Sequence, residues 1–157
     1  MAKSILKLKN YEVHAIGSSF NGKLNMNIAS WVMQTSMDGK TIVVALYKPD
    51  FTLELVKKSN RLCISFLAEN QSNLISKLGR KSGRETDKLS KLDFGISPGG
   101  CPYLNQAIGY LDCEVIHWAD GGDHELAICK VLKSQNLNIE KQVLRLNYLR
   151  EKGLIRG

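Results

Sequence analysis

The chain has 157 residues, which is enough for one domain with a substantial hydrophobic core. Its 43% hydrophobic and 24% charged residues are typical of a globular protein and exclude a largely disordered one. Because 22 Lys and Arg outnumber 15 Asp and Glu, the net charge is +7, which allows an anionic cofactor, nucleic acid or an acidic protein partner.

Organisation along the chain is simple, without repeats, low-complexity tracts or linkers, and predicts a single domain over residues 1–157. No apolar run approaches the roughly 20 residues that a membrane span needs, and no apolar region follows the N-terminal cations as in a secretory signal. We therefore expect a cytoplasmic protein without membrane contact. Aromatic residues are only 7% and do not interleave with Arg, so nucleic-acid binding is not favoured.

Apolar runs and alternation predict four strands in the first half of the chain, over residues 13–18, 28–34, 40–47 and 61–67. A turn cluster of Ser, Asn and Gly follows the first of them. Apolar residues spaced three and four apart predict a helix over residues 50–59. A second helix is predicted over residues 70–78, with Asn70 as its N-cap and Gly79 as its stop.

In the second half, the turn sequence ADGGD separates two apolar runs and predicts a hairpin. The predicted elements are a loop over residues 97–102, the hairpin strands over 107–118 and 126–132, and a final strand over 142–150. Strands and helices do not alternate as a doubly wound fold requires. The sequence therefore predicts a mainly β protein, an antiparallel barrel with helices against its ends.

Three polar segments stand where these apolar patterns break or end. The first can bring amides, a hydroxyl, a small side chain and strand-edge backbone groups to a planar polar ring. Its residues are Asn25, Met26, Asn27, Ile28, Ala29, Ser30 and Trp31. An ordinary turn that runs into a strand explains this segment equally well.

The other two segments carry cations and hydroxyls suited to a phosphate. Lys48 and Thr52 stand near the start of the predicted helix, where free N–H groups and the helix dipole attract anions. Asp50 or Thr52 could instead simply cap the helix. Ser82 and Arg84 lie in the sequence GRKSGRETDK, which could equally be a solvated basic loop.

Other residues offer little chemistry. The four cysteines have wide spacings that favour buried thiols over disulfides or a metal site, and no metal is expected. His124 follows the hairpin turn, and a lone histidine is most often structural. The chain lacks GxGxxG, GxxxxGK[ST], HExxH and GxSxG motifs, so dinucleotide-fold, P-loop, zinc-protease and serine-hydrolase chemistry have no support.

Taken in order, these segments resemble the flavin reductase-like family, the FMN-binding split-barrel proteins, over residues 11–132. The similar stretches are NMNIASW, KPDFTLELVKKSNRLCISFL, LGRKSGRETDKLSKLDF and the late hairpin with its GDH sequence. Two features depart from the family pattern. Leu89 replaces the Phe of SGRxxDKF, and Cys129 and Lys130 stand where members often have Gly-Glu.

The resemblance implies a six-stranded antiparallel Greek-key barrel with flanking helices, usually a homodimer, with FMN near the dimer interface. It implies that residues 25–31 line the flavin ring, largely through backbone groups. It also implies that His124, the candidate catalytic residue, lies at the mouth of the site near an incoming nicotinamide or second flavin. By the same resemblance, the residues near the FMN phosphate would be Lys48, Thr52, Ser82 and Arg84.

Three functions follow as hypotheses. The first is an FMN-binding oxidoreductase that takes a hydride from NADH or NADPH and passes electrons to free flavin or a protein acceptor. The second is an FMN electron carrier, like a flavoredoxin, that does not use nicotinamide. The third is a non-enzymatic binding module with a basic surface.

Overall fold

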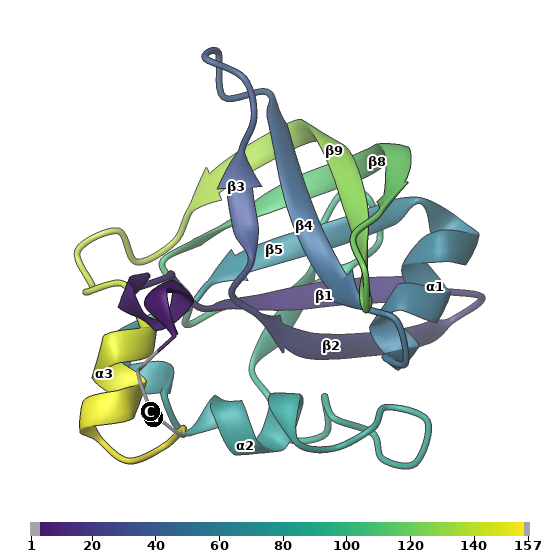
Figure 1. Cartoon of the computed structure of the whole chain (residues 1–157). Coiled ribbons are helices and arrows are strands. Elements are labelled where there is room, and N and C mark those ends of the chain that lie inside the picture. The colour runs from purple at the N-terminus through teal and green to yellow at the C-terminus, as the bar shows by residue number, and fades with distance from the viewer. Residues whose placement is uncertain (1–3, 156–157) are drawn as a thin grey trace.

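The computed structural model describes residues 4–155 and is built around one curled antiparallel sheet (Figure 1). The sheet has seven strands in the order β2-β1-β5-β8-β9-β4-β3. Their bounds are β1 His14–Phe20, β2 Lys23–Ala29, β3 Val32–Gln34, β4 Thr41–Tyr47, β5 Arg61–Phe66, β8 Gly109–Asp120 and β9 His124–Asn136. A separate two-stranded sheet pairs β6 (Phe94–Ile96) with β7 (Pro102–Leu104).

The second strand begins earlier than the sequence indicates. Asn21 and Gly22 connect β1 to β2 with φ angles of 48° and 77°, the conformation of a tight two-residue hairpin turn. Strand β2 therefore already begins at Lys23 and carries most of the first polar segment. The predicted strand over residues 28–34 is wrong in its bounds, because the chain leaves β2 after Ala29 and enters β3 only at Val32.

The two edges of the sheet are consecutive in the chain. Strands β2 and β3 stand at opposite ends of the strand order, yet only Ser30 and Trp31 separate them. The sheet must therefore curl until its edges meet, and the backbone N–H of Ala45 in β4 donates to the Trp31 carbonyl at 2.9 Å. The result is a split barrel, with seven strands rather than the expected six.

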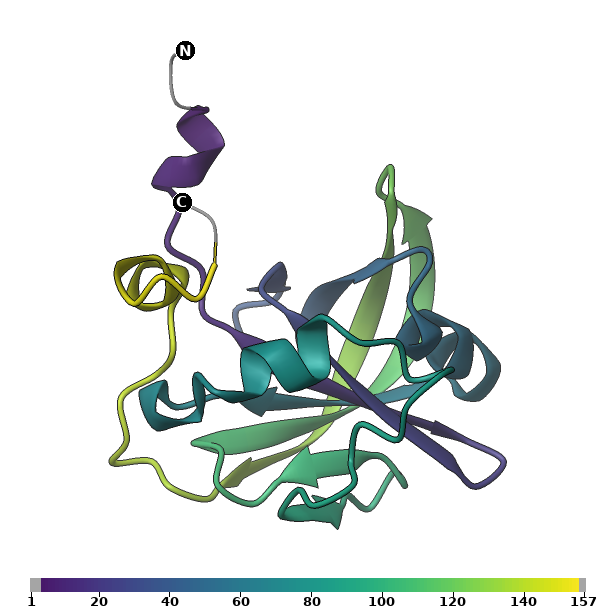
Figure 2. The same ribbon diagram turned by 90° about the horizontal axis from the view of Figure 1, so that it is seen from below.

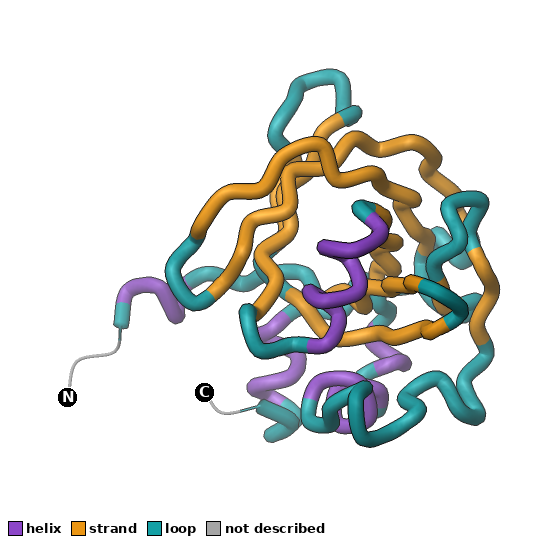
Figure 3. Tube along the Cα trace, turned by 90° about the vertical axis from the view of Figure 1, so that its right-hand side faces the viewer, coloured by secondary structure: helices purple, strands orange, loops and turns teal. Residues whose placement is uncertain are grey.

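Helices cover the barrel at one opening and below its first hairpin. Helix α1 (Phe51–Ser59) lies across the opening in Figure 3, where Leu53 and Val56 join the core inside the barrel. Helix α2 (Leu74–Gly79) and helix α3 (Leu146–Glu151) pack on a second core that includes Met26 of β2 (Figure 2). Among the described residues, no helix has the length and apolarity to span a membrane.

Two predicted elements near these helices differ from the structure. The final strand predicted over residues 142–150 is wrong, because this stretch forms only isolated bridges before α3 begins at Leu146. Burial of Leu149 in the second core holds the helix there. The predicted helix over residues 70–78 is divided into a 3-10 turn (Glu69–Gln71) and α2, so Asn70 is not an N-cap.

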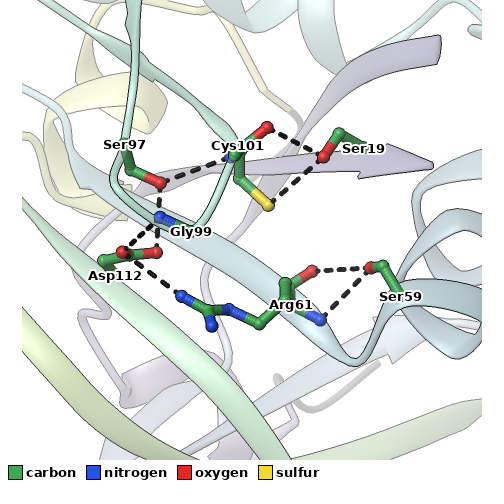
Figure 4. Close-up of polar contacts among 8 residues, drawn as sticks. Ser19, Ser59, Arg61, Ser97, Gly99, Cys101 and Asp112 are labelled. Atoms are coloured by element: carbon green, nitrogen blue, oxygen red, sulfur yellow. Dashed lines mark hydrogen bonds and ion pairs between the residues drawn. The ribbon is translucent and has the colours of Figure 1, made fainter. Parts of the chain in front are cut away.

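A buried carboxylate anchors the loop that the sequence predicts over residues 97–102 (Figure 4). Asp112 is 1% exposed and accepts hydrogen bonds from the Ser97 hydroxyl at 3.1 Å and the Gly99 N–H at 2.9 Å. The guanidinium of Arg61 lies 3.5 Å from the same carboxylate. The loop is thereby tied to the neighbouring strands β5 and β8, and its last residue, Pro102, begins β7.

All four cysteines are buried free thiols, as predicted. Burial raises the pKa of each one above its ordinary value, to about 12 for Cys129. At neutral pH these thiols are therefore protonated and act as small hydrophobic side chains.

His14 makes the stability of the fold dependent on pH. Burial lowers its pKa from 6.5 to about 4, and its ring contacts Phe66 at a centroid distance of 4.7 Å. Below pH 6.5, His14 of the unfolded chain takes up a proton, whereas His14 of the folded protein stays neutral until about pH 4. Protonation of His14 therefore favours the unfolded chain at low pH. The free energy of unfolding is highest above pH 6.5 and is about 2 kcal/mol lower at pH 5. Between pH 7.5 and pH 5, the free energy of unfolding in urea should fall less for His14→Gln than for the parent protein. An equal fall in the two proteins would contradict this assignment.

Candidate functional site

The three polar segments meet at the split of the barrel. Two small pockets adjoin there, and both are lined by Asn27 of β2 and Asp50 at the start of α1. The first pocket has a volume of about 180 Å³ and the second about 220 Å³. The segments thus form one continuous groove rather than three separate features.

The first pocket lies over the gap between the sheet edges. One wall is residues 27–31, from β2 and the link that follows it, and the other is Ala45 and Tyr47 of β4 with His124 of β9. Because β2 pairs only with β1, its outer edge offers unpaired backbone N–H and C=O groups to a ligand. The backbone groups of such an edge can form hydrogen bonds with polar atoms at the rim of a planar ring.

Three rings form an exposed surface beside this pocket. The His124 ring lies between Trp31 and Tyr47, with centroid distances of 4.8 Å and 5.2 Å. Its Nδ1 lies 2.7 Å from a carboxylate oxygen of Asp123, which fixes the orientation of the ring. Trp31 and Tyr47 are nevertheless 51% and 45% exposed, and large aromatic side chains with so much exposed surface are typical of places where a ligand or another protein binds.

The second pocket is suited to an anion. It is lined by the first residues of α1, where backbone N–H groups have no partner within the helix, and by residues 79–83. Thr52 is fully buried there, and its hydroxyl accepts a hydrogen bond from the Asn25 amide at 2.9 Å. Gly83 packs so closely on Asn25 that a Cβ at this position would overlap with the Asn25 amide oxygen. Only glycine allows the loop to approach this closely.

Asp50 and Asn27 leave hydrogen-bond acceptors between the two pockets. Asp50 stands at the N-cap position of α1, but its side chain makes no capping hydrogen bond. Its carboxylate instead accepts a hydrogen bond from the side-chain amide of Asn27 at 2.7 Å. Oδ1 of the same Asn27 side chain is buried and has no hydrogen-bond partner. A buried acceptor without a partner costs about 1–3 kcal/mol, which a ligand donor can recover. The simple capping interpretation of Asp50 is therefore wrong.

Lys88 is a pocket residue that the sequence did not single out. It lines the second pocket, is 6% exposed, and its ammonium donates to the Leu78 carbonyl at 2.7 Å. Burial lowers its pKa, and the nearby charge of Asp50 opposes this shift. A buried ammonium with so little compensation attracts an anion. The only signal in the sequence was its place at the end of GRKSGRETDK.

The structure brings most of the predicted site residues to the groove. Ile28, Ala29 and Ser30 line the first pocket together with Asn27, Trp31 and His124, whereas Asn25, Thr52 and Ser82 line the second. Met26 is an exception within its segment, because its side chain is buried in the second core and only its backbone can face a ligand.

Two predicted phosphate residues lie elsewhere. The ammonium of Lys48 points to the tip of the β8–β9 hairpin and pairs with Asp120 at 2.7 Å, so Lys48 lines neither pocket. The guanidinium of Arg84 donates to the Pro49 carbonyl at 2.9 Å and to Glu54 at 3.0 Å, and it lines a larger neighbouring cleft. Both cations are therefore held by ion pairs or hydrogen bonds to residues far away in the sequence.

Known proteins are similar to this chain in sequence and in fold. The Flavin reductase like domain family matches residues 10–152. High molecular weight rubredoxin of Moorella thermoacetica is 32% identical over 82% of this chain and 57% of its own length. FMN reductase (NADH) RutF of Agrobacterium fabrum is 29% identical over 66% of this chain and 59% of its own length. The chain thus spans little more than half the length of these relatives.

A solved structure agrees with these sequence matches. The FMN-binding protein from Thermus thermophilus is 25% identical and superposes with a TM-score of 0.78 over 85% of this chain and 75% of its own. The residues matched by the family contain every element from β1 to α3 and the whole of both pockets. The chain belongs to the flavin reductase-like domain family.

Proposed function

We propose that this protein is an FMN-dependent flavin reductase. It takes a hydride from NADH or NADPH and passes the electrons to free flavin or a protein acceptor. The observation that carries the proposal is the groove itself, in which a ring-sized pocket and an anion pocket adjoin at the acceptors of Asn27 and Asp50. The names of the FMN-binding and FMN-reducing relatives support the same cofactor.

The residues of the groove match the parts of FMN in order. The flavin ring fits the first pocket against the edge of β2, and the phosphate fits the second beside Lys88, Ser82 and the N-terminus of α1. The ribityl hydroxyls between them are donors, as the unpaired Oδ1 of Asn27 requires. When bound, FMN supplies the hydride chemistry, whereas the chain supplies binding and orientation.

His124 and its two aromatic neighbours are assigned to the nicotinamide side. Trp31 and Tyr47, which flank the His124 ring, are about half exposed beside the flavin pocket, and a second planar ring can stack on one of them. His124 orients this surface through its contact with Asp123. It is a positioning residue for the incoming donor in this proposal.

Flavin binding and reduction test the proposal directly. The purified protein is titrated with FMN, and the complex is then mixed with NADH or NADPH without oxygen. Loss of the visible flavin absorbance within seconds to minutes is expected with at least one nicotinamide. A protein that binds no flavin, or an FMN complex that neither nucleotide reduces, would refute the reductase assignment.

An electron carrier is the second candidate, and the similarity to high molecular weight rubredoxin favours it. In this case the chain binds FMN and exchanges electrons only with a redox protein. Reduction of the complex by a reduced iron–sulfur protein, without reduction by either nicotinamide, would select this function. The basic net charge of +7 suits an acidic protein partner.

A homodimer in the cytoplasm is part of the same proposal. The N-terminal 3-10 turn (Ile5–Leu8) projects from the body of the protein in Figure 2, and Ile5, Leu6 and Leu8 are 69–78% exposed. Met33 in β3 and Met37 in the turn after it are exposed apolar side chains as well. Light scattering after gel filtration is expected to give twice the mass of the chain.

A further inference from the structure

The two pockets of the groove differ in charge. Asp50 is the one carboxylate among the described residues that line the first pocket, and none of those residues is Lys or Arg. The second pocket, assigned to the phosphate, is lined by Arg80, Lys81 and Lys88. The cations of the groove are therefore gathered around the phosphate, whereas the flavin ring would lie beside a negative charge.

The carboxylate of Asp50 is fixed at the boundary of the first pocket. Its Oδ2 accepts a hydrogen bond from the Asn27 side-chain amide at 2.7 Å, and its backbone N–H donates to the Tyr47 carbonyl at 3.0 Å. Asn27 and Tyr47 line the first pocket themselves, and Asp50 is half-buried between them. These contacts hold the negative charge at the groove instead of letting it turn away into solvent.

Two nearby basic side chains are already matched by carboxylates. His124 lines the first pocket, but its Nδ1 lies 2.7 Å from a carboxylate oxygen of Asp123, which offsets the charge of a protonated ring. The ammonium of Lys48 pairs with Asp120 at 2.7 Å and does not line the pocket. Neither group therefore brings an uncompensated positive charge to the ring.

Reduction changes the charge that the first pocket must hold. A hydride carries two electrons and one proton, so the flavin ring gains one negative charge and the nicotinamide that gives up the hydride gains one positive charge. A charge near the flavin ring is one of the means by which a protein tunes the electronics of this cofactor. In a partly exposed site, a like charge across a pocket of this size disfavours the reduced form by about tenfold.

We propose that Asp50 sets the reduction potential of the bound flavin below that of free FMN. The inference rests on the proposed function, because it takes the flavin ring to lie in the first pocket. The charge of Asp50 disfavours the reduced, negatively charged ring and has little effect on the neutral oxidised ring. The protein therefore binds reduced FMN more weakly than oxidised FMN, and the same carboxylate promotes release of the reduced flavin to an acceptor.

Reductive titration of the FMN complex with dithionite and a redox dye tests this inference. The potential of the parent complex is expected to lie below that of free FMN. Asp50→Asn replaces the carboxylate by an amide of the same shape. In this variant, reduced FMN should bind about tenfold more tightly relative to oxidised FMN, which raises the potential by about 30 mV for two electrons. Riboflavin should show the same rise, because it has the ring without the phosphate.

Glu54→Gln is the matched control. It makes the same change of charge one turn further along α1, at a side chain that lines neither pocket. The potential should move by less than about a third as much, because solvent and salt screen this more distant charge. Chemical unfolding of each apo protein verifies that the variants are folded.

Each other outcome has a definite meaning. A potential of the parent complex at or above that of free FMN would overturn the inference. Equal potentials for Asp50→Asn and the parent would also overturn it, since the carboxylate would then affect both redox states alike. The proposed function fails separately, because dithionite needs no nicotinamide: a complex that neither nucleotide reduces would still show the shift. A protein that binds no flavin would overturn the proposed function and the inference together.

Discussion

Replacement of Lys88 by Met is expected to weaken FMN binding by about 10–100-fold and to leave riboflavin binding nearly unchanged. A charge-assisted hydrogen bond contributes about 1.5–3 kcal/mol, and only FMN has the phosphate that can form one. The phosphate would also reverse the effect of burial on the pKa of Lys88, because a neighbouring anion favours the charged form. Titrations of the two ligands, followed by quenching of flavin fluorescence, measure the difference.

Stability separates this prediction from simple misfolding. Because burial already disfavours the Lys88 charge, Met at this position should leave the apo protein equally stable or more so. Lys48→Met is the matched control, since Lys48 pairs with Asp120 away from the pocket, and it should change FMN affinity by less than about twofold. Equal losses for FMN and riboflavin in Lys88→Met, or a larger loss in Lys48→Met, would contradict the phosphate assignment.

Gly17→Ala is expected to destabilise the fold by about 3 kcal/mol or more, one of the largest losses that a single methyl group can cause. Gly17 lies within β1, where β7 crosses it, and a Cβ there would overlap with the backbone carbonyl oxygen of Pro102. A side chain could rotate away, but this carbonyl belongs to a strand that is tied to β6 and, through the Asp112 loop, to β5 and β8. Strands β1 and β7 must therefore move apart to make room for the methyl group.

Chemical unfolding of the apo protein measures this loss. Ser18→Ala is the control from the same strand, because it removes only a hydroxyl that donates to the Asn25 carbonyl at 3.4 Å. It should cost about 1 kcal/mol or less. A midpoint for Gly17→Ala close to that of Ser18→Ala would show that β7 can move away from β1 without breaking the sheet.

The sequence predicted the fold class well because the local signals were strong. The late hairpin, helix α1 and the buried strand β4 all have clear periodicity, and the structure contains each of them within a few residues. Helix α3 could not be predicted, since its apolar residues follow a strand-like alternation, and burial against the second core decides its conformation. The small β6–β7 sheet was missed because both strands are only three residues long, with Gly95 inside β6 and Pro102 at the start of β7.

The candidate site was only partly predictable for a related reason. Segments that carry polar residues at the ends of apolar runs could be recognised, and the structure brings them together. The direction of a long side chain depends on partners from other elements. Lys48 pairs with Asp120, and Arg84 donates to the Pro49 carbonyl and to Glu54. Lys88 instead points inward and donates to the Leu78 carbonyl. No pattern within one segment contains this information.

The four buried thiols have a consequence for how long such a protein can work in air. Reduced flavin released into aerated solution generates hydrogen peroxide, and peroxide attacks the thiolate form of cysteine. Because burial raises the pKa of Cys63, Cys101, Cys113 and Cys129, almost no thiolate is present at neutral pH. Under the proposed function, the protein is therefore expected to keep its cysteines unmodified through many turnovers in oxygen, which mass spectrometry after turnover can verify.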